Sequence, residues 1–586
     1  MRLSSTASWD SALGDGSAID WAGSLSEVRV TANNEAPATA TVDLTAASVD
    51  TFAVDGAGDL SFVAVSGGAI NASAYDFSGA TGRVEYNLPT GEAPVSSGSN
   101  TLLLGGGSGV PSVAAGKTLT LGPWGATEDG GVTYTYTGGT SGIFTPAAGS
   151  TLVFSPGEGK VQKAGGFGGT NTGTTIAITN GTLVANLPTT SGTASVFFGN
   201  NSVRIDNGGI LSLEAQDALG YTYAHTVTIN KGGVLRVKVR DTLKRTTAMN
   251  GGKIEIYGEN NGRGLDFHGP TFNVLDNSSV DQMEAVSKVG MRNGTTYVNV
   301  NDGKRFEINA NLYTEEASSL TVRAAENQPN KSGVVVLNGY SDSPMQTFTG
   351  TVTVGESGRV TTLELNCEHQ NGTYVVNANS RLRGSGSITG NGGVTLAAAS
   401  SKLCGSLTVN NVTAASGGTY GDQWNTVAAK ITDSFKAGGT QTISYGSLTI
   451  GKDCVVTNAA GTANTTAASF SIAANGNLKI EQDVAVAGLT VADGGTITLV
   501  GTKVNGVWDV PEIAVSGTPV YNGGVNVVLD FGSANVPSGF KVKLPTGVSA
   551  ANVTVTDSKG QRKWRVAAEG DNLYATSDGG FRLVIF

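Results

Sequence analysis

Residues 207–214 read NGGILSLE, and the phrase returns as KGGVLRVK at 231–238 and as NGGKIEIY at 250–257. Later copies begin at Asn391 and Asp493. Two glycines supply positive φ at little cost, so each pair predicts a corner of the chain. The alternation of apolar and polar residues that follows predicts a strand with one buried face. The phrase therefore describes one corner and one short strand.

The spacing of the phrase indicates a repeat. Gly209, Gly233 and Gly252 mark three successive copies. Their period is about 20 residues, which is typical of solenoids. One such coil cannot bury its apolar face alone, whereas coils stacked about 4.8 Å apart bury a continuous core and pair every strand. We therefore predict an all-β fold, most simply a right-handed parallel β-helix (a β-solenoid) with terminal caps.

The composition supports strands and turns. Of 586 residues, 84 are glycine and only 14% are charged, and β-branched residues interrupt every window that could form a long helix. A helical bundle, a Rossmann enzyme and a TIM barrel are therefore excluded. A string of β-sandwich domains is the competing interpretation. It predicts repeats of about 90–110 residues joined by Pro-rich linkers, and the 15 prolines form no such linker.

Three segments are expected along the chain. Residues 1–40 are expected to cap the solenoid, with Trp9 and Trp21 as anchors, because an open last coil leaves a strand edge exposed. Residues 41–504 are expected to form coils of about 18–24 residues. Residues 505–586 lose the repeated phrase and gain prolines, which favours a small β-domain or cap.

Residues 276–290, DNSSVDQMEAVSKVG, depart from the strand pattern. Four apolar side chains recur at helical spacing, a Ser and a Gln fit a capping box, and a glycine follows. The segment predicts a short helix inserted on a loop of one coil. The apolar positions are Val280, Met283, Val286 and Val289.

The charge and the cysteines exclude several classes of function. A net charge of −10 disfavours binding to nucleic acid or to anionic membranes. No apolar run is long enough to span a bilayer, and the first residues lack the apolar stretch of a signal peptide. Cys367, Cys404 and Cys454 lack the spacing of metal ligands and are expected to be free thiols. We expect no cofactor.

One stretch resembles a known family. Ser380 to Val409, SRLRGSGSITGNGGVTLAAASSKLCGSLTV, resembles the passenger-associated repeats of bacterial autotransporters, and Gln346 to Leu365 is similar to the autotransporter-associated strand repeat. The resemblance implies a secreted or surface-exposed β-helix that acts as an adhesin or a structural stalk, and it implies no activity. No run of barrel strands follows it, so we expect a passenger without its barrel or a family member exported differently. The chain ends in Phe586, as outer-membrane barrels do, but Arg582 falls in the row of lipid-facing residues.

β-Helices also carry polysaccharide lyases and hydrolases, which need paired carboxylates. The nearest candidates are Glu255 and Asp266, with His268 close by in sequence. The Asn-Thr-Asp, Asp-Asp and Gly-His-Gly patterns of polygalacturonases are missing. We therefore expect Glu255 to be a solvent-facing strand residue and His268 a turn residue. The acids best placed for a calcium-dependent lyase are Asp276, Asp281 and Glu284, which more simply belong to a polar surface.

Two groups of residues are candidates for binding. Basic side chains alternate along 235–240, and they could hold an anionic glycan or could be balanced by acids on neighbouring coils. Trp424 and Tyr420 could form a platform that stacks a sugar, or could anchor a loop over the core. The basic candidates are Arg236, Lys238, Arg240, Lys244 and Arg245.

These observations favour a non-enzymatic extracellular β-solenoid of a bacterial surface. Its partner would be a surface glycan or another cell, bound by multivalent contact. The first alternative is a self-assembling filament or surface-layer subunit whose solenoid ends stack. The others are a polysaccharide lyase or hydrolase and a phage tailspike.

Overall fold

The structure is a computed structural model, which describes most of the chain from residue 201 onward and mainly strands before it. Trp9, Trp21 and Arg245 lie outside the described residues. From 201 to 578 the description omits 220–225, 245, 258–262, 315–316, 328–331, 341–344, 346–347, 415–416, 459–467 and 561. Before 201 it covers 25–31, 38–42, 47–56, 60–64, 70–80, 84–87, 101–102, 118–124, 133–134, 151–154, 158, 161–164, 175–185 and 198.

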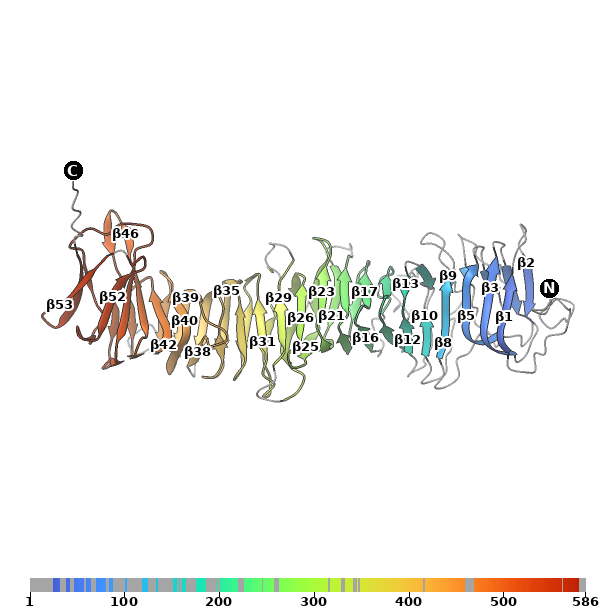
Figure 1. The fold of residues 1–586 in the computed structure, drawn as a ribbon, viewed down its shortest axis with the longest axis horizontal. Helices are drawn as coiled ribbons and strands as arrows, with labels where there is room; N and C mark the ends of the chain where they lie inside the picture. The colour runs from blue at the N-terminus through green and yellow to red at the C-terminus, as the bar shows by residue number, and fades with distance from the viewer. Residues whose placement is uncertain are drawn as a thin grey trace. The chain divides into compact units, whose positions relative to one another are not determined.

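The chain divides into two compact units, residues 1–296 and 297–586, and its described residues contain strands and no helix. In unit 1 the strands pair in parallel with strands of the next coil, so that they form successive ladders (Figure 1). The first ladder comprises β1 (Leu25–Thr31), β3 (Ala47–Gly56), β5 (Ile70–Ala80), β8 (Thr118–Trp124), β10 (Thr151–Phe154), β12 (Thr175–Ile178), β14 (Ser202–Ile205), β16 (Val227–Asn230), β19 (Thr247–Asn250) and β22 (Thr271–Asp276).

Two further sets of parallel pairs complete the coils of unit 1. The second ladder comprises β7 (Thr101–Leu102), β9 (Thr133–Tyr134), β11 (Val161–Ala164), β13 (Gly181–Ala185), β15 (Gly209–Leu213), β17 (Val234–Val237), β20 (Lys253–Ile256) and β23 (Ser278–Gln282). The third set comprises β2 (Ala38–Val42), β4 (Leu60–Ala64) and β6 (Val84–Asn87), then β18 (Asp241–Leu243), β21 (Arg263–His268) and β24 (Lys288–Arg292). β25 (Gly294–Val300) contains the boundary between the units.

Unit 2 repeats this arrangement. One ladder comprises β28 (Ser318–Ala324), β30 (Thr351–Val354), β33 (Thr373–Val376), β35 (Ser387–Leu396), β37 (Thr408–Ala414), β39 (Lys430–Ala437) and β41 (Val455–Asn458). A second comprises β26 (Arg305–Asn309), β29 (Val334–Leu337), β31 (Thr362–Leu365), β34 (Arg381–Gly384), β36 (Lys402–Leu403), β38 (Gly418–Tyr420), β40 (Thr440–Ile450), β42 (Ser469–Ile480), β44 (Gly488–Ala492) and β49 (Val520–Asn522). β27 spans Leu312–Thr314.

A third ladder of unit 2 uses one half of each of several long, bent strands, the first half of β35, β37 and β39 and the second half of β40 and β42. It begins at β32 (Glu368–Gln370), passes through β35, β37, β39, β40 and β42, and continues in β45 (Thr496–Val500), β50 (Val525–Asp530) and β52 (Val553–Asp557). Parallel pairing therefore continues beyond residue 504, where the sequence suggested the solenoid would end. The remaining strands are the parallel pair β43 (Val484–Val486) and β48 (Ile513–Val515), the antiparallel hairpin β46 (Thr502–Val504) and β47 (Val507–Asp509), and the antiparallel sheet β51 (Lys541–Lys543), β54 (Asn572–Ser577) and β53 (Trp564–Glu569).

The buried face of each strand stacks on the same face of the next. Leu211, Leu235, Ile254 and Val280 succeed one another in register on β15, β17, β20 and β23, and each is completely buried. Each strand thus removes its apolar side chains from water against the coil before and the coil after. The prediction of an all-β parallel solenoid is confirmed, with small antiparallel sheets added near the C-terminus.

The two glycines of the repeated phrase have different roles, whereas the sequence suggested that both supply positive φ. Gly208 has a φ of +72°, so it turns the corner. Gly209 does not need positive φ, but a Cβ there would lie 2.4 Å from the carbonyl oxygen of Ile178 on the preceding coil. The second glycine therefore permits close approach of two coils. Gly232 and Gly233 repeat this division.

Coil length varies more than expected while register is kept. On the second ladder of unit 2, Lys402 pairs with Thr419, whereas Thr490 pairs with Val520, so the second of these coils is far longer than the first. The additional residues are accommodated in the corners between strands, so paired strands remain aligned.

The expected helix at 276–290 is wrong. Ser278–Gln282 is β23 and Lys288–Arg292 is β24, with a turn between them. Val280 and Val289 are buried, whereas Met283 and Val286 are 42% and 48% exposed. The apolar residues at helical spacing therefore do not share one face, because a corner separates the two strands. No helix among the described residues is long and apolar enough to cross a membrane.

Candidate functional site

The basic side chains near 236 are paired with acids on adjacent coils. Arg236 lies opposite Glu255 across β17 and β20, and their side chains form an ion pair at 3.0 Å. Lys238 lies 3.4 Å from Glu214 and is about half exposed. Of the two interpretations of the basic residues, these ion pairs favour the one in which acids on neighbouring coils balance the positive charge. The pairing leaves less positive charge for an anionic glycan than the sequence suggested.

Arg240 takes part in a more buried cluster. Its guanidinium donates to Asp266 at 2.6 Å, and Arg292 approaches the same carboxylate oxygen at 3.3 Å. Asp266 is completely buried, so the two arginines stabilise a carboxylate that water does not reach. Lys244 is exposed beyond this cluster, and Arg245 lies outside the described residues.

The carboxylates of unit 1 are poorly arranged for hydrolysis. Burial would raise the pKa of Glu255, but hydrogen bonds from Lys253 and Arg236 outweigh burial and lower that pKa. An ionised Glu255 cannot serve as a general acid. It is buried rather than solvent-facing, and His268 lies in strand β21 rather than in a turn. Burial, together with the charge of Asp217, raises the pKa of Asp241, which is completely buried and accepts N–H bonds from Leu219 and Thr242.

Trp424 has an exposed fraction of 82%. It is the most exposed aromatic residue among those whose side chains the structure describes. It lies in a tight turn that Asp422 and Asn425 close by two backbone hydrogen bonds of 2.8 and 3.1 Å. One oxygen of Asp422 also accepts the backbone N–H groups of Trp424 and Asn425, at 3.0 and 2.9 Å. The turn is therefore held from within, and it presents a large apolar ring to solvent.

Cations of two earlier coils hold this turn against the solenoid. The other oxygen of Asp422 accepts hydrogen bonds from Arg381 at 3.1 Å and from Lys402 at 2.9 Å. Burial opposes ionisation, but the bonds from Lys402, from the Trp424 N–H and from Arg381 hold the pKa of Asp422 far below its ordinary value. Asp422 is therefore ionised at any physiological pH.

The prediction that Tyr420 joins Trp424 in a platform that stacks a sugar is wrong. Tyr420 is completely buried, and its hydroxyl donates to the side-chain carbonyl of Gln441 at 3.0 Å. Its ring packs edge-on against Phe435 at 6.4 Å between centroids. Tyr420 is one position of an inward row on β38, so it supports the coil that carries Trp424 without meeting a ligand.

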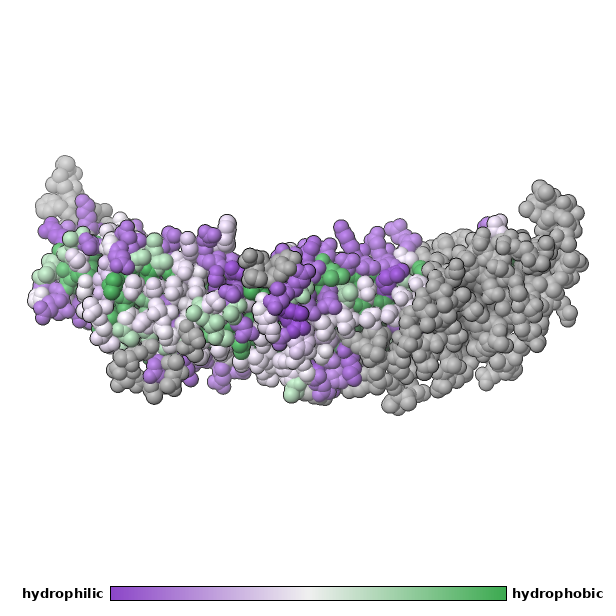
Figure 2. Space-filling model, turned by 90° about the horizontal axis from the view of Figure 1, so that it is seen from below, coloured by the Kyte–Doolittle hydropathy of each residue, from purple (hydrophilic) through white to green (hydrophobic). Residues whose placement is uncertain are grey.

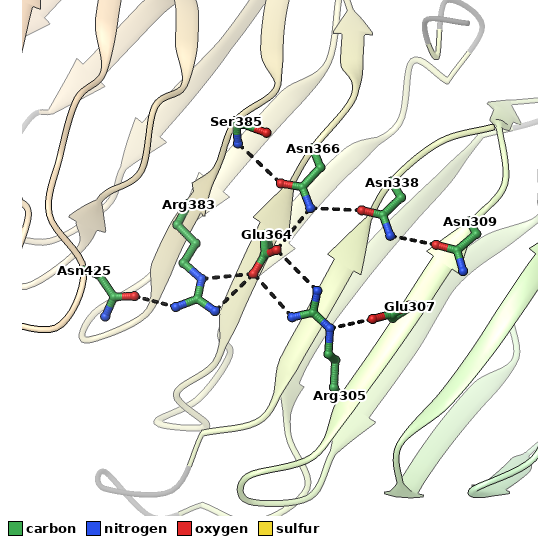
Figure 3. A network of polar contacts seen from close by, with 9 residues as sticks. All are labelled: Arg305, Glu307, Asn309, Asn338, Glu364, Asn366, Arg383, Ser385 and Asn425. Carbon is green, nitrogen blue, oxygen red and sulfur yellow. Dashed lines mark hydrogen bonds and ion pairs between the residues drawn. The ribbon is translucent and has the colours of Figure 1, made fainter. Parts of the chain in front are cut away.

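A network of polar side chains continues from the turn across four coils (Figure 3). Asn425 accepts a hydrogen bond from Arg383, and Arg383 pairs with Glu364 at 3.0 Å. Glu364 in turn meets Arg305 at 3.3 Å. Burial would raise the pKa of Glu364, but bonds from Asn366 and Arg305 lower it, so this carboxylate is ionised. One anion therefore lies between two arginines.

A ladder of asparagines runs beside these charges. Asn366 donates to Asn338 at 2.9 Å, and Asn338 donates to Asn309 at 2.7 Å. Ser385 closes the row through its backbone N–H (Figure 3). Amide ladders of this kind satisfy donors and acceptors between coils and fix side-chain positions. The face under the turn is therefore polar and ordered.

We call this surface the Trp424 face. It consists of the exposed Trp424 ring, the polar residues of the turn that carries it, and the basic side chains of earlier coils that bond to this turn. A rigid aromatic ring beside arginine donors suits the apolar face and hydroxyls of a sugar. No group of His, Cys, Asp and Glu that could hold a metal occurs within the part of the chain that the structure describes. The Trp424 face comprises Arg381, Arg383, Lys402, Asp422, Trp424 and Asn425.

Sequence reasoning found Trp424 but missed Asp422 and its two cations. Arg381, Lys402 and Asp422 are separated by about one coil each, so only the coil register brings them together. On the side of the molecule seen in the space-filling view, hydrophobic side chains form small groups among hydrophilic and neutral ones (Figure 2).

Comparison with solved structures finds a distant likeness. The chain is similar to a crystal structure of a TibC-catalyzed, hyper-glycosylated TibA fragment, with 15% identity over 72% of this chain and 97% of that chain and a TM-score of 0.18. No protein-family model matches the chain, and no curated protein does. A likeness at this level carries no argument about function, which rests on the residues above.

Proposed function

We propose that this chain is a non-enzymatic, surface-exposed or secreted bacterial β-solenoid that acts as an adhesin and binds a surface glycan through the Trp424 face. The observation that carries the proposal is the 82% exposed Trp424 ring on a turn fixed by Asp422. An exposed tryptophan is unfavourable in water. A structure that fixes the ring outward therefore favours a partner that covers it.

The chemistry around the ring supports a sugar as that partner. The C–H face of a pyranose packs on an indole, and hydroxyls accept from guanidinium groups. Arg381 and Arg383 are 24% and 32% exposed in their side chains, so part of each guanidinium remains reachable. The repeat resemblance to autotransporter passengers supports the same role. Many such chains on one cell would then give avidity from weak single contacts.

A glycan array with the full-length chain tests this proposal. The Trp424→Ala variant should lose about two- to tenfold in affinity for the glycans that the native chain binds, since an aromatic contact contributes about 0.5–1.5 kcal/mol. Trp424→Phe should retain part of the signal. Val507→Ala is the matched control, because Val507 is 71% exposed in the same unit and lies outside the Trp424 face. Unchanged binding by Trp424→Ala would overturn the proposal.

A further inference from the structure

A shallow, half-open depression lies in unit 2 between two corner loops of adjacent coils, and its space of about 340 Å³ includes open solvent. Residues 531–536 follow β50, and Ser558, Lys559 and Arg562 follow β52, which ends at Asp557; the two strands pair in parallel from Val525 with Val553. The N–H of Ser558 donates to the carbonyl of Leu529 at 3.0 Å, which ties the second loop to the first coil. The walls are therefore held by the solenoid. The Trp424 face has no residue in this cleft.

One wall of the cleft is aromatic. Phe531 and Trp564 line it, with ring centroids 6.1 Å apart and planes inclined by 16°. Behind them, Trp508 of the β46–β47 hairpin packs edge-on against Phe531 at 4.9 Å, and Phe540 does so at 5.8 Å. The wall is thus a supported apolar surface. Aromatic surfaces of this kind pack against the C–H face of a sugar ring.

The indole groups of this wall lack acceptors. Nε1 of Trp564 and Nε1 of Trp508 are buried, and neither has a hydrogen-bond partner among the described residues. Tryptophan N–H groups usually find a partner when buried. Since the ring of Trp564 lines the cleft, an oxygen bound there would supply the missing acceptor after a small movement of the ring. The N–H of Trp564 is therefore a donor that the described residues leave unused beside the cleft.

The remaining lining is positively charged. Lys559 and Arg562 both line the cleft, and within the described residues neither side chain forms an ion pair. The acid of the lining is Asp557, whose two oxygens accept the backbone N–H groups of Lys559 at 2.9 Å and Arg562 at 2.7 Å. Its carboxylate is therefore used to shape the turn. The two cations remain available to an anion.

We propose that this cleft binds one uronate residue of an acidic polysaccharide, with the pyranose ring on the half-buried Trp564, which the buried Phe531 supports, and the carboxylate between Lys559 and Arg562. A neutral sugar would satisfy the aromatic wall and leave the cations without a partner. An inorganic anion would satisfy the cations and leave the wall exposed. The uronate matches both halves, and the site is separate from the Trp424 face.

Isothermal titration calorimetry with the full chain at low salt tests the proposal, using hexagalacturonate as the probe and maltohexaose as the neutral control. Saturable binding of hexagalacturonate alone is expected. Lys559→Gln and Arg562→Gln should each weaken it by about tenfold or more, as expected for a lost charge-assisted contact. Arg565→Gln is the matched charge control, because Arg565 is 80% exposed and pairs with Asp578. Thermal unfolding confirms that each variant is folded.

Three outcomes would overturn the uronate site. They are equal affinity for the two hexasaccharides, unchanged affinity in Lys559→Gln and Arg562→Gln, and competition by inorganic phosphate at the same concentration. A tryptophan fluorescence change on binding should disappear in Trp564→Phe and persist in Trp424→Ala. If Trp424→Ala alone abolishes hexagalacturonate binding, the cleft is not the site. If Trp424→Ala leaves hexagalacturonate binding unchanged but weakens binding to the glycan array, the cleft and the Trp424 face are two independent sites.

Discussion

Asp422 accepts a hydrogen bond from Nε of Arg381 at 3.1 Å, although 41 residues of sequence separate them. The bond runs from strand β34 to a turn two coils later, and Lys402 of the coil between joins the same oxygen. The result is a charged clamp that joins three coils. Removing Asp422 would leave Arg381 and Lys402 partly buried without the anion that they share.

Asp422→Ala should therefore lower the free energy of unfolding by about 1–3 kcal/mol, since it removes the acceptor of both cations and of two backbone N–H groups. Urea denaturation followed by circular dichroism measures the change. Because the pKa of Asp422 is lowered on folding, its contribution is present above the ordinary carboxylate pKa and is lost as pH falls through the folded value. An Asp422→Ala chain as stable as the native one would refute the clamp.

A buried histidine predicts a second pH dependence. His369 is completely buried, with Nε2 2.7 Å from the carbonyl of Phe348 and Nδ1 2.7 Å from the hydroxyl of Tyr374. The carbonyl requires a donor, so Nε2–H donates, Nδ1 accepts, and the ring is neutral. Burial lowers the pKa of His369 despite the bond to Phe348.

The unfolded chain binds this proton near the ordinary pKa of about 6.5, whereas the folded chain binds it only at lower pH. Stability is therefore highest above a pH of about 6.5 and falls as pH drops below it, by up to about 1.4 kcal/mol per pH unit. Urea midpoints between pH 8 and pH 5 measure the slope. His369→Gln should be less stable at pH 8 and should show a smaller slope. An identical slope in the variant would assign the effect to other groups.

Glu364 should be more important than its partial exposure of 18% suggests, because two arginines and Asn366 depend on it. We expect Glu364→Gln to cost about 1–3 kcal/mol, since it leaves Arg305 and Arg383 without their shared anion. A double-mutant cycle with Arg383→Gln measures the coupling. Glu307→Gln is the control, because Glu307 meets only Arg305 in this network and is 37% exposed. Additive effects at 364 and 383 would contradict the network.

The two glycines of one corner should respond differently to alanine. Gly208→Ala meets no atom closer than 3.6 Å but must adopt positive φ, which costs about 1 kcal/mol. Gly209→Ala would place a Cβ 2.4 Å from a backbone carbonyl, so two coils must move apart, and overpacking costs about 1–3 kcal/mol or more. Thermal unfolding of the two variants should rank Gly209→Ala as the less stable. The opposite order would show that backbone strain, not approach of coils, limits the repeat.

The cysteines should be unreactive in the folded chain. All three are buried, and burial raises the pKa of Cys367 and of Cys454 to about 12 and that of Cys404 to about 11. The thiolate is the reactive form. A disulfide reagent at pH 8 should therefore label fewer than one thiol per chain before unfolding and all three after it. Rapid labelling of the native chain would contradict the burial.

The alternation of apolar and polar residues predicted the strands well, because a two-residue period places every second side chain on the buried face of a strand. Leu235 and Val237 point inward and Arg236 points outward, as the phrase indicates. The period fails where a corner interrupts it. Val280 and Val289 are inward on two different strands, and their spacing imitated a helix only because a turn of suitable length separates them.

The candidate sites depend on register, which short-range patterns do not contain. Trp424 could be picked out as a large ring in a glycine-rich region, but Tyr420, close to it in sequence, gives the same signal and is buried. Only the pairing of β36 with β38 shows that Tyr420 belongs to an inward row. The uronate cleft combines loops after β50 and β52, which the sequence had assigned to a separate end domain.

Coil length ranges from the short step between Lys402 and Thr419 to the much longer one between Thr490 and Val520. The segments between paired strands therefore differ in length, whereas the pairing register of the strands is kept. Residues inserted at a corner leave the paired strands in register, so a new recognition loop does not require a new core. The scaffold is therefore suited to display of a grafted peptide at a long corner.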